Sequence, residues 1–203
     1  MEFDKSFSFI KYLYKNPLFG FALVIIFTAL LVSILGANIR PDGTLHSNTQ
    51  IPQISRLNPG TTISFLKVRK NKEVQKSNFF ERLFFGGQES FFIFVPYDKC
   101  ELKDNYVLLQ EYDMNRNEPD YVPNTLTFSF EDIVLNLNDQ ASTNPEGIKD
   151  LVLSNHLVEK TFFLGTDKHG RDLLSRLMAG TIISLSIGLI SVLISFFLGL
   201  TLG

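Results

Sequence analysis

Two long uncharged runs constrain this chain more than any other feature of its sequence. Pro17 to Ala37 holds 21 residues without a charge, and Leu177 to Gly203 holds 27. A helix needs about 20 apolar residues to cross the hydrocarbon core of a bilayer. Residues 38–176, between the runs, have the charges and turns of a water-soluble region. We therefore expect an α-helical membrane protein with two transmembrane helices and an inserted extracytoplasmic α+β domain, made mostly of short strands.

The distribution of basic residues predicts how the chain is oriented. Three lysines precede the first run, whereas the residues that follow it closely include only Arg40 and Arg56. Because basic residues favour the cytoplasmic side, we expect a cytoplasmic N-terminus, with an amphipathic lead over residues 1–16. Residues 38–176 then lie outside. A cleaved secretory signal is the alternative for the first run, but this run exceeds the usual apolar length of about 7–15 residues.

The region between the runs is expected to form a small, antiparallel sheet with short helices. Stretches rich in β-branched and aromatic residues predict the strands. We expect these at Thr61–Arg69, Phe91–Tyr97, Tyr106–Tyr112 and from Leu126 to Phe130. The acidic pair Glu131-Asp132 interrupts the pattern after Phe130. Helices are expected at Asn78–Phe85, ended by two glycines, and at residues 146–160.

Charge is uneven within this region. Residues 67–82 carry six Lys/Arg against two Glu, and seven phenylalanines fall within residues 79–94. Such a stretch indicates either a solvated face beside a hydrophobic core, which we favour, or a segment that rests on a membrane surface. Basic residues among aromatics also occur in nucleic-acid-binding proteins, but the expected export and the net charge of −2 argue against a nucleic-acid partner.

Candidate catalytic residues are not evident in the sequence. Cys100 is the single cysteine, so no intramolecular disulfide is expected, and the three histidines stand far apart without ligand spacing. We find no Ser/His/Asp grouping, paired carboxylates or C-x-x-C spacing. The prediction is a protein that is not an enzyme, without catalytic, cofactor-binding or metal-ligating residues.

A polar, glycine-containing segment stands directly before the second run. It reads G-T-D-x-x-G-R-D-x-x-S-R, and its defining residues are Gly165, Thr166, Asp167, Gly170, Arg171, Asp172, Ser175 and Arg176. Gly165 permits a tight turn, and Thr166 or Asp167 is expected to cap the following helix. Asp167 with Arg171, and Asp172 with Arg176, have the i, i+4 spacing of helical ion pairs. A phosphate-binding loop is excluded because arginine replaces its lysine and Asp172 replaces its metal-binding hydroxyl.

The second run carries a stripe of small residues at helical spacing. Successive members lie three or four positions apart, so they share one face of a helix. The stripe consists of Gly180, Ser184, Gly188, Ser191, Ser195, Gly199 and Gly203. Small residues are common in membrane helices, but they also allow helices to approach closely in lipid, where no hydrophobic force drives association. A stripe of this length favours a bundle of several helices.

The motif and the run after it resemble the segment before the second transmembrane helix in permease subunits of bacterial ABC importers. The resemblance is to the C-type subunit of the dipeptide, oligopeptide and nickel class. It implies a multi-pass inner-membrane permease that imports peptides or a similar small solute. It also implies a second permease subunit, two ATPase subunits that hydrolyse ATP, and an extracytoplasmic solute-binding protein as partners. The motif would then have a structural or gating role.

The resemblance does not extend over the whole chain. It is specific over residues 163–203, weaker over residues 1–37 and absent over residues 38–160. Family members continue with further helices and a cytoplasmic loop that docks on the ATPase, so the resemblance implies an N-terminal portion of a permease. The alternative function is a two-span membrane scaffold or sensor with an exported interaction domain. A membrane-anchored enzyme has no residue set to support it.

Overall fold

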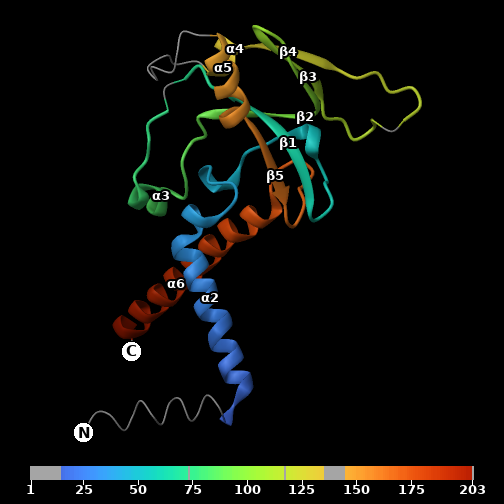
Figure 1. Ribbon diagram of the computed structural model, residues 1–203. Helices are drawn as coiled ribbons and strands as arrows, with labels where there is room; N and C mark the ends of the chain where they lie inside the picture. The colour runs from blue at the N-terminus through green and yellow to red at the C-terminus, as the bar shows by residue number, and fades with distance from the viewer. Residues whose placement is uncertain (1–14, 73, 117, 135–144, 203) are drawn as a thin grey trace.

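Two long apolar helices and a separate antiparallel sheet make up the described chain (Figure 1). The computed structural model describes residues 15–72, 74–116, 118–134 and 145–202. The long helices lie on one side of the sheet region, and each joins it at one end. Most of the amphipathic lead predicted for residues 1–16 falls outside the described residues.

The two long helices are each long and apolar enough to cross a membrane. Helix α2 spans Pro17–Ile39 and α6 spans Leu173–Leu202. Proline suits the first turn of α2 because an N–H there has no partner within the helix. Most of the exposed large apolar side chains among the described residues lie on these two helices. Figure 1 shows α2 and α6 crossing near the sheet region and then diverging.

The crossing of the two helices depends on small residues at the end of α2. Gly36 and Ala37 are the buried residues of this helix. A methyl group placed on Gly36 would lie 3.7 Å from Cδ1 of Ile182 on α6. The backbone of α2 therefore approaches α6 at the point where both helices meet the sheet region.

Five antiparallel strands form the sheet, in the order β4-β3-β2-β1-β5. Their bounds are Thr61–Arg69 for β1, Phe92–Leu102 for β2, Tyr106–Glu111 for β3, Thr125–Ser129 for β4 and Leu157–Phe162 for β5. Strand β5 comes late in the chain and pairs with β1, with Thr61 opposite Phe162. This pairing places the segment after β5 beside the loop that precedes β1.

The predicted strands are present, and β2 is longer than its prediction. The strand was expected to end at Tyr97, but β2 continues to Leu102. The carbonyl of Pro96 accepts a hydrogen bond from the N–H of Tyr112 at 3.1 Å, directly after the end of β3. The N–H that proline lacks would point to the same side, so its absence falls where the ladder with β3 ends. The ladder between β2 and β3 shifts register between Tyr97 and Lys99, which absorbs the irregularity.

The helix predicted over residues 146–160 is present as far as His156 and is wrong only over residues 157–160, which belong to a strand. Helix α5 covers Pro145–Leu151, a single π-helical turn covers Val152–His156, and β5 follows. The apolar residues of this stretch satisfy a helical period locally, but pairing with β1 overrides that preference from Leu157 onward. Two short α-helices also lie in the region, α3 at Phe79–Phe85 and α4 at Phe130–Val134, and two single 3-10 turns lie at Leu45–Ser47 and Pro52–Ile54.

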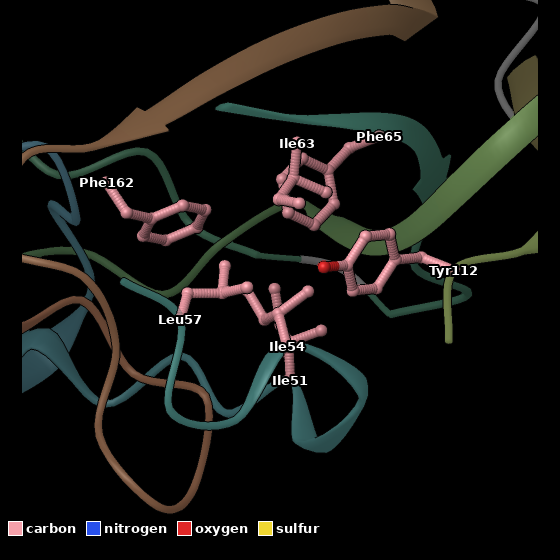
Figure 2. Packing of buried hydrophobic residues seen from close by; sticks show 7 residues of the cluster. All are labelled: Ile51, Ile54, Leu57, Ile63, Phe65, Tyr112 and Phe162. Atoms are coloured by element: carbon pink, nitrogen blue, oxygen red, sulfur yellow. The ribbon is translucent and has the colours of Figure 1, made fainter. Parts of the chain in front are cut away.

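Two hydrophobic clusters cover the opposite faces of the sheet. One cluster, centred on Leu66, lies on the face that α4 and the π turn cover. The other lies between the sheet and the loop before β1, as Figure 2 shows, and its buried members are Ile51, Ile54, Leu57, Ile63, Phe65, Tyr112 and Phe162. Ile63 and Phe65 share a face while Leu66 points to the other, as expected of alternating strand residues.

Candidate functional site

The G-T-D-x-x-G-R-D-x-x-S-R motif forms the connection from β5 to α6 and packs against residues 40–58. We call this contact between residues 40–58 and residues 165–176 the junction. Gly165 and Gly170 have left-handed φ values of +74° and +70°. A Cβ on Gly165 would lie 2.1 Å from the carbonyl oxygen of Leu57, and one on Gly170 would lie 1.8 Å from that of Ile51. Both positions therefore require glycine.

Thr166 links the motif to the loop through its buried hydroxyl. The Oγ1 atom accepts a hydrogen bond from the N–H of Leu57 at 2.9 Å and donates to the carbonyl of Ile54. The backbone N–H of Thr166 also donates to the carbonyl of Leu57 at 3.3 Å. One threonine thereby satisfies a donor and two acceptors of a buried loop, which would otherwise lack partners.

Asp167 and Arg171 form an ion pair within a turn. The Nε and Nη2 atoms of Arg171 each lie 2.7 Å from Oδ2 of Asp167. The other carboxylate oxygen accepts the N–H groups of His169 and Arg171 at 2.8 and 3.0 Å. Burial raises the pKa of Asp167, but the hydrogen bonds from Arg171 and from the His169 amide outweigh it and lower the pKa to about 2. This carboxylate stays charged at any physiological pH.

Asp172 and Ser175 begin α6 and connect it to the end of α2. Asp172 accepts hydrogen bonds from the N–H of Ser175 at 3.0 Å and from its hydroxyl. The Ser175 hydroxyl in turn accepts the N–H of Asp42 at 2.8 Å. The hydroxyl of Ser47 lies 3.1 Å from the carbonyl oxygen of Ser175 and donates to it. Ser47 and Ser175 are both fully buried, so the first turn of α6 is fixed against the loop that follows α2.

Arg40 and Asp42 organise that loop, and sequence reasoning missed both. Arg40, directly after α2, is buried and donates to the carbonyls of Asp42, Thr44 and Gly86. The carboxylate of Asp42 accepts hydrogen bonds from the backbone and hydroxyl groups of Thr44 and Thr49. The available signal was a run of Asp, Thr and Ser after an apolar helix, which is typical of turns that bond their own backbone.

A cavity of about 180 Å³ opens at the edge of the junction. Lys160 of β5 lines it together with Asp42 and Asp172. The Lys160 ammonium lies 3.5 Å from the centre of the Phe94 ring and, among the described residues, forms no hydrogen bond or ion pair. Burial lowers the pKa of Lys160, while Asp42 and Asp172 partly oppose the shift. The Lys160 ammonium therefore lies near the carboxylates of Asp42 and Asp172 but forms no ion pair with either.

Two expectations for the motif are wrong in detail. Asp172 caps α6, rather than Thr166 or Asp167. Its side chain accepts the N–H of Ser175, the third residue of the helix. Asp172 forms no ion pair with Arg176 in the described chain, because its carboxylate binds Ser175 instead. The predicted pair of Asp167 and Arg171 is present, but the turn before α6 provides the geometry rather than a helix.

The described glycines of the small-residue stripe do not contact other elements of the described chain. A Cβ placed on Gly180, Gly188 or Gly199 would have no neighbouring atom within 4 Å outside its own helix. Helix α2 instead contacts α6 near Met178 and Ile182. Gly203 lies outside the described residues. Packing of this stripe against other helices stays a prediction.

The junction connects elements that lie far apart in the sequence. Over the described parts of the chain, no group of three or more His, Cys, Asp or Glu residues is placed to bind a metal ion. Its polar groups bond mostly to each other and to the backbone. The arrangement fixes the start of α6, the end of α2 and the loop before β1 as one unit.

Comparison with known proteins finds a short, strong similarity. The "Di/tripeptide transport system permease protein DppC" of Pseudomonas aeruginosa (strain UCBPP-PA14) is 62% identical to this chain over 42 residues. The match covers 21% of this chain and 14% of that permease. No protein-family model and no solved structure matches the chain. The chain thus contains an ABC-permease-like segment, and it spans only a small part of the length of the permease it matches.

Proposed function

We propose that this chain is the N-terminal portion of a permease subunit of an ATP-driven importer for peptides or a similar small solute. The observation that carries the proposal is the 62% identity over 42 residues to a di/tripeptide permease. Two helices long and apolar enough to cross a membrane are consistent with it. The proposed location is the inner membrane of a bacterium, in a multi-pass arrangement with a cytoplasmic N-terminus and the sheet region outside.

The proposed partners follow from the same permease context. A second permease subunit would complete the pathway, two ATPase subunits would supply energy, and an extracytoplasmic solute-binding protein would deliver the solute. The open small-residue stripe on α6 is suited to contact with helices of a partner subunit. The sheet region is the candidate surface for receiving the binding protein.

The junction has a structural role in this proposal. Its hydrogen bonds fix α6 relative to the end of α2 on the side of the membrane where the solute would enter. Gating motions rotate packed helices as rigid bodies more readily than they bend them. A firm junction would therefore transmit movement of the sheet region to both helices together.

Cysteine labelling tests the orientation. In a Cys100→Ser background, Val122→Cys places a thiol in an exposed loop of the sheet region, and Lys15→Cys places one before α2. A membrane-impermeant maleimide should label position 122 in cells with a permeable outer membrane, and position 15 only after the inner membrane is disrupted. The opposite pattern would overturn the orientation, and equal labelling of both would overturn the membrane-spanning placement.

Solute uptake tests the function. Removing the gene region for residues 1–203 from its own host should abolish energy-dependent uptake of radiolabelled di- and tripeptides, and the intact gene should restore it. A control deletion of an unrelated membrane protein should leave uptake unchanged. Normal peptide uptake in the deletion strain would contradict the peptide assignment, and an assay with other labelled small solutes would then decide whether any import is lost.

A two-span scaffold or sensor is the second candidate, and the uncovered stripe on α6 is the observation that favours it. Small residues on a free face also suit a homodimer. Ser191→Cys on the stripe and Leu193→Cys on the opposite side of the helix distinguish the two, in the Cys100→Ser background. Cross-linking of Ser191→Cys to a second permease subunit supports the importer, whereas disulfide-linked pairs of this chain support the scaffold. Leu193→Cys should give neither product.

A further inference from the structure

Helix α3 displays two phenylalanines that the core of the sheet region does not use. Phe79 and Phe80 are 52% and 69% exposed, and their rings meet edge to face at 5.6 Å. The sequence favoured a solvated basic face beside a hydrophobic core for this stretch. These two rings instead lie outside both hydrophobic clusters. Adjacent exposed aromatic rings on one short helix form an apolar surface that a membrane or a partner can cover.

The position of α3 is fixed relative to the outer end of α2. Gly86, directly after α3, offers its carbonyl to the side chain of Arg40 and to the N–H of His46 at 3.2 Å. The N–H of Gln88 donates to the carbonyl of Gly43 at 2.9 Å. Gly87 lies so close to this loop that a Cβ there would come within 2.6 Å of Arg40. Figure 1 shows α3 beside the end of α2 that joins the sheet region.

The charges around α3 suit the headgroups of a membrane. Lys76 is exposed in the segment that leads into the helix and forms no ion pair in the described chain, whereas Lys72, also exposed, pairs with Glu89 at 3.2 Å. The acidic residue of α3, Glu81, bonds the N–H of Asn78 at 2.8 Å in a capping box and so is used locally. Basic residues beside exposed aromatic rings bind the boundary between headgroups and acyl chains, where rings are buried and cations meet lipid phosphates.

We propose that α3 is a membrane-surface anchor whose two phenylalanines insert into the lipid leaflet next to the sheet region. The inference rests on the proposed placement of α2 across the membrane. The apolar surface of α2 ends where Arg40 begins the junction, and the Arg40 side chain bonds the residue that ends α3. The lipid surface that surrounds the outer end of α2 is thus continuous with the position of α3. Contact there would set the tilt of the sheet region over the bilayer.

Tryptophan fluorescence provides the test, because the chain contains no tryptophan. The full chain is placed in vesicles of phosphatidylcholine and phosphatidylglycerol with one new tryptophan per variant. Phe80→Trp reports on α3, Phe27→Trp on the middle of α2, and Val122→Trp on an exposed loop of the sheet region. Lipids brominated near the headgroup or near the end of the acyl chain quench shallow or deep tryptophans, respectively.

The proposal predicts that shallow bromines reduce the fluorescence of Phe80→Trp about twofold and leave Val122→Trp unchanged. Deep bromines should quench Phe27→Trp. If bromines leave Phe80→Trp unquenched, as they do Val122→Trp, while Phe27→Trp is quenched, the anchor is overturned. The placement of α2 across the membrane then still holds, and the phenylalanines cover a protein partner instead. If Phe27→Trp is not quenched, the membrane-spanning part of the proposed function fails, and Phe80→Trp still decides whether α3 binds lipid.

A second substitution checks that the phenylalanine surface causes the contact. Phe79→Glu, added to Phe80→Trp, should remove most of the shallow quenching because it places a charge among the acyl chains. Leu153→Glu is the matched control, since Leu153 is an exposed apolar residue on the π turn at the far part of the sheet region. Quenching that survives Phe79→Glu, or that Leu153→Glu removes equally, would contradict the proposal.

Discussion

The guanidinium of Arg171 contacts the carboxylate of Asp167 through two nitrogens, each 2.7 Å from Oδ2. Its third nitrogen, Nη1, donates to the side-chain oxygen of Asn48 at 3.2 Å. The pair therefore joins the turn before α6 to the loop that follows α2. Because both side chains are less than a fifth exposed, solvent screens this pair less than an ordinary surface ion pair.

Acidification is the first test of this contact. The pKa of Asp167 is about 2 in the folded protein, below its ordinary value of 3.8. The contribution of Asp167 to stability is thus fully present above about pH 4 and is lost as the pH falls toward 2. Asp167→Asn should lower the free energy of unfolding by about 1–2 kcal/mol at pH 7, and the difference should vanish near pH 2. Urea titration in a mild detergent, followed by tyrosine near-UV circular dichroism, measures the free energy of unfolding. If the two chains still differ by the same amount near pH 2, the stabilising role of the Asp167 charge is contradicted.

Thr166→Val tests the buried hydroxyl of the motif. Valine has a similar shape but leaves the N–H of Leu57 and the carbonyl of Ile54 without the partner they have in the folded chain. We expect a loss of about 2 kcal/mol in the free energy of unfolding. Thr62→Val is the matched control, since its hydroxyl pairs with Thr161 at 2.8 Å on an exposed face and should cost less than about 0.5 kcal/mol. Equal effects of the two would argue against a special role for Thr166.

Gly170→Ala tests the close approach of the motif to the loop before β1. The added methyl would lie 1.8 Å from the carbonyl oxygen of Ile51, so the loops must separate. The expected loss is about 3 kcal/mol or more. Gly60→Ala separates this clash from backbone strain, because Gly60 has a similar φ of +79° but no atom within 4 Å of its Cβ position. It should cost about 1 kcal/mol, and a similar cost for both variants would show that the contact is unimportant.

Lys160→Met tests the cation in the junction cavity. Methionine keeps the length of the side chain and its contact with Phe94 while removing a half-buried charge without an ion-pair partner. We expect it to raise the free energy of unfolding by about 1 kcal/mol near pH 7. Because burial lowers the pKa of Lys160, the gain should shrink as the pH approaches 10.5, where the native side chain is also neutral. Lys99→Met, on the exposed surface of β2, is the control and should change the free energy of unfolding little. If Lys160→Met destabilises the chain instead, the Lys160 ammonium has a favourable partner and the prediction is wrong.

Local patterns in the sequence were sufficient for several elements. The two apolar runs predicted both long helices, and β-branched residues predicted β1 with its observed bounds, Thr61–Arg69. The two glycines after α3 predicted its end, where Gly86 adopts a left-handed conformation. Each of these depends on properties of neighbouring residues along the chain: uninterrupted apolarity, alternation, or a backbone angle that glycine alone adopts readily.

Other features depended on residues far apart in the sequence. The helix predicted over residues 146–160 gives way to β5 at Leu157 because β1 offers an unpaired edge, and a local period does not reveal that edge. Arg40 and Ser47 are functional candidates only because the fold brings α6 and α3 to them. The exposure of Phe79 and Phe80 likewise follows from where α3 is attached, since the same sequence would also suit a core.

The sequence by itself determined that this chain has two membrane-length helices, a strand-rich region between them and a polar motif before the second helix. Hydrophobic length, strand alternation and glycine spacing are local properties, and they act before any long-range contact forms. Only the tertiary structure decided which partners the motif binds. The hydrogen bonds of Thr166 and Ser175 join positions more than a hundred residues apart, and their geometry exists only once the sheet has closed between β1 and β5.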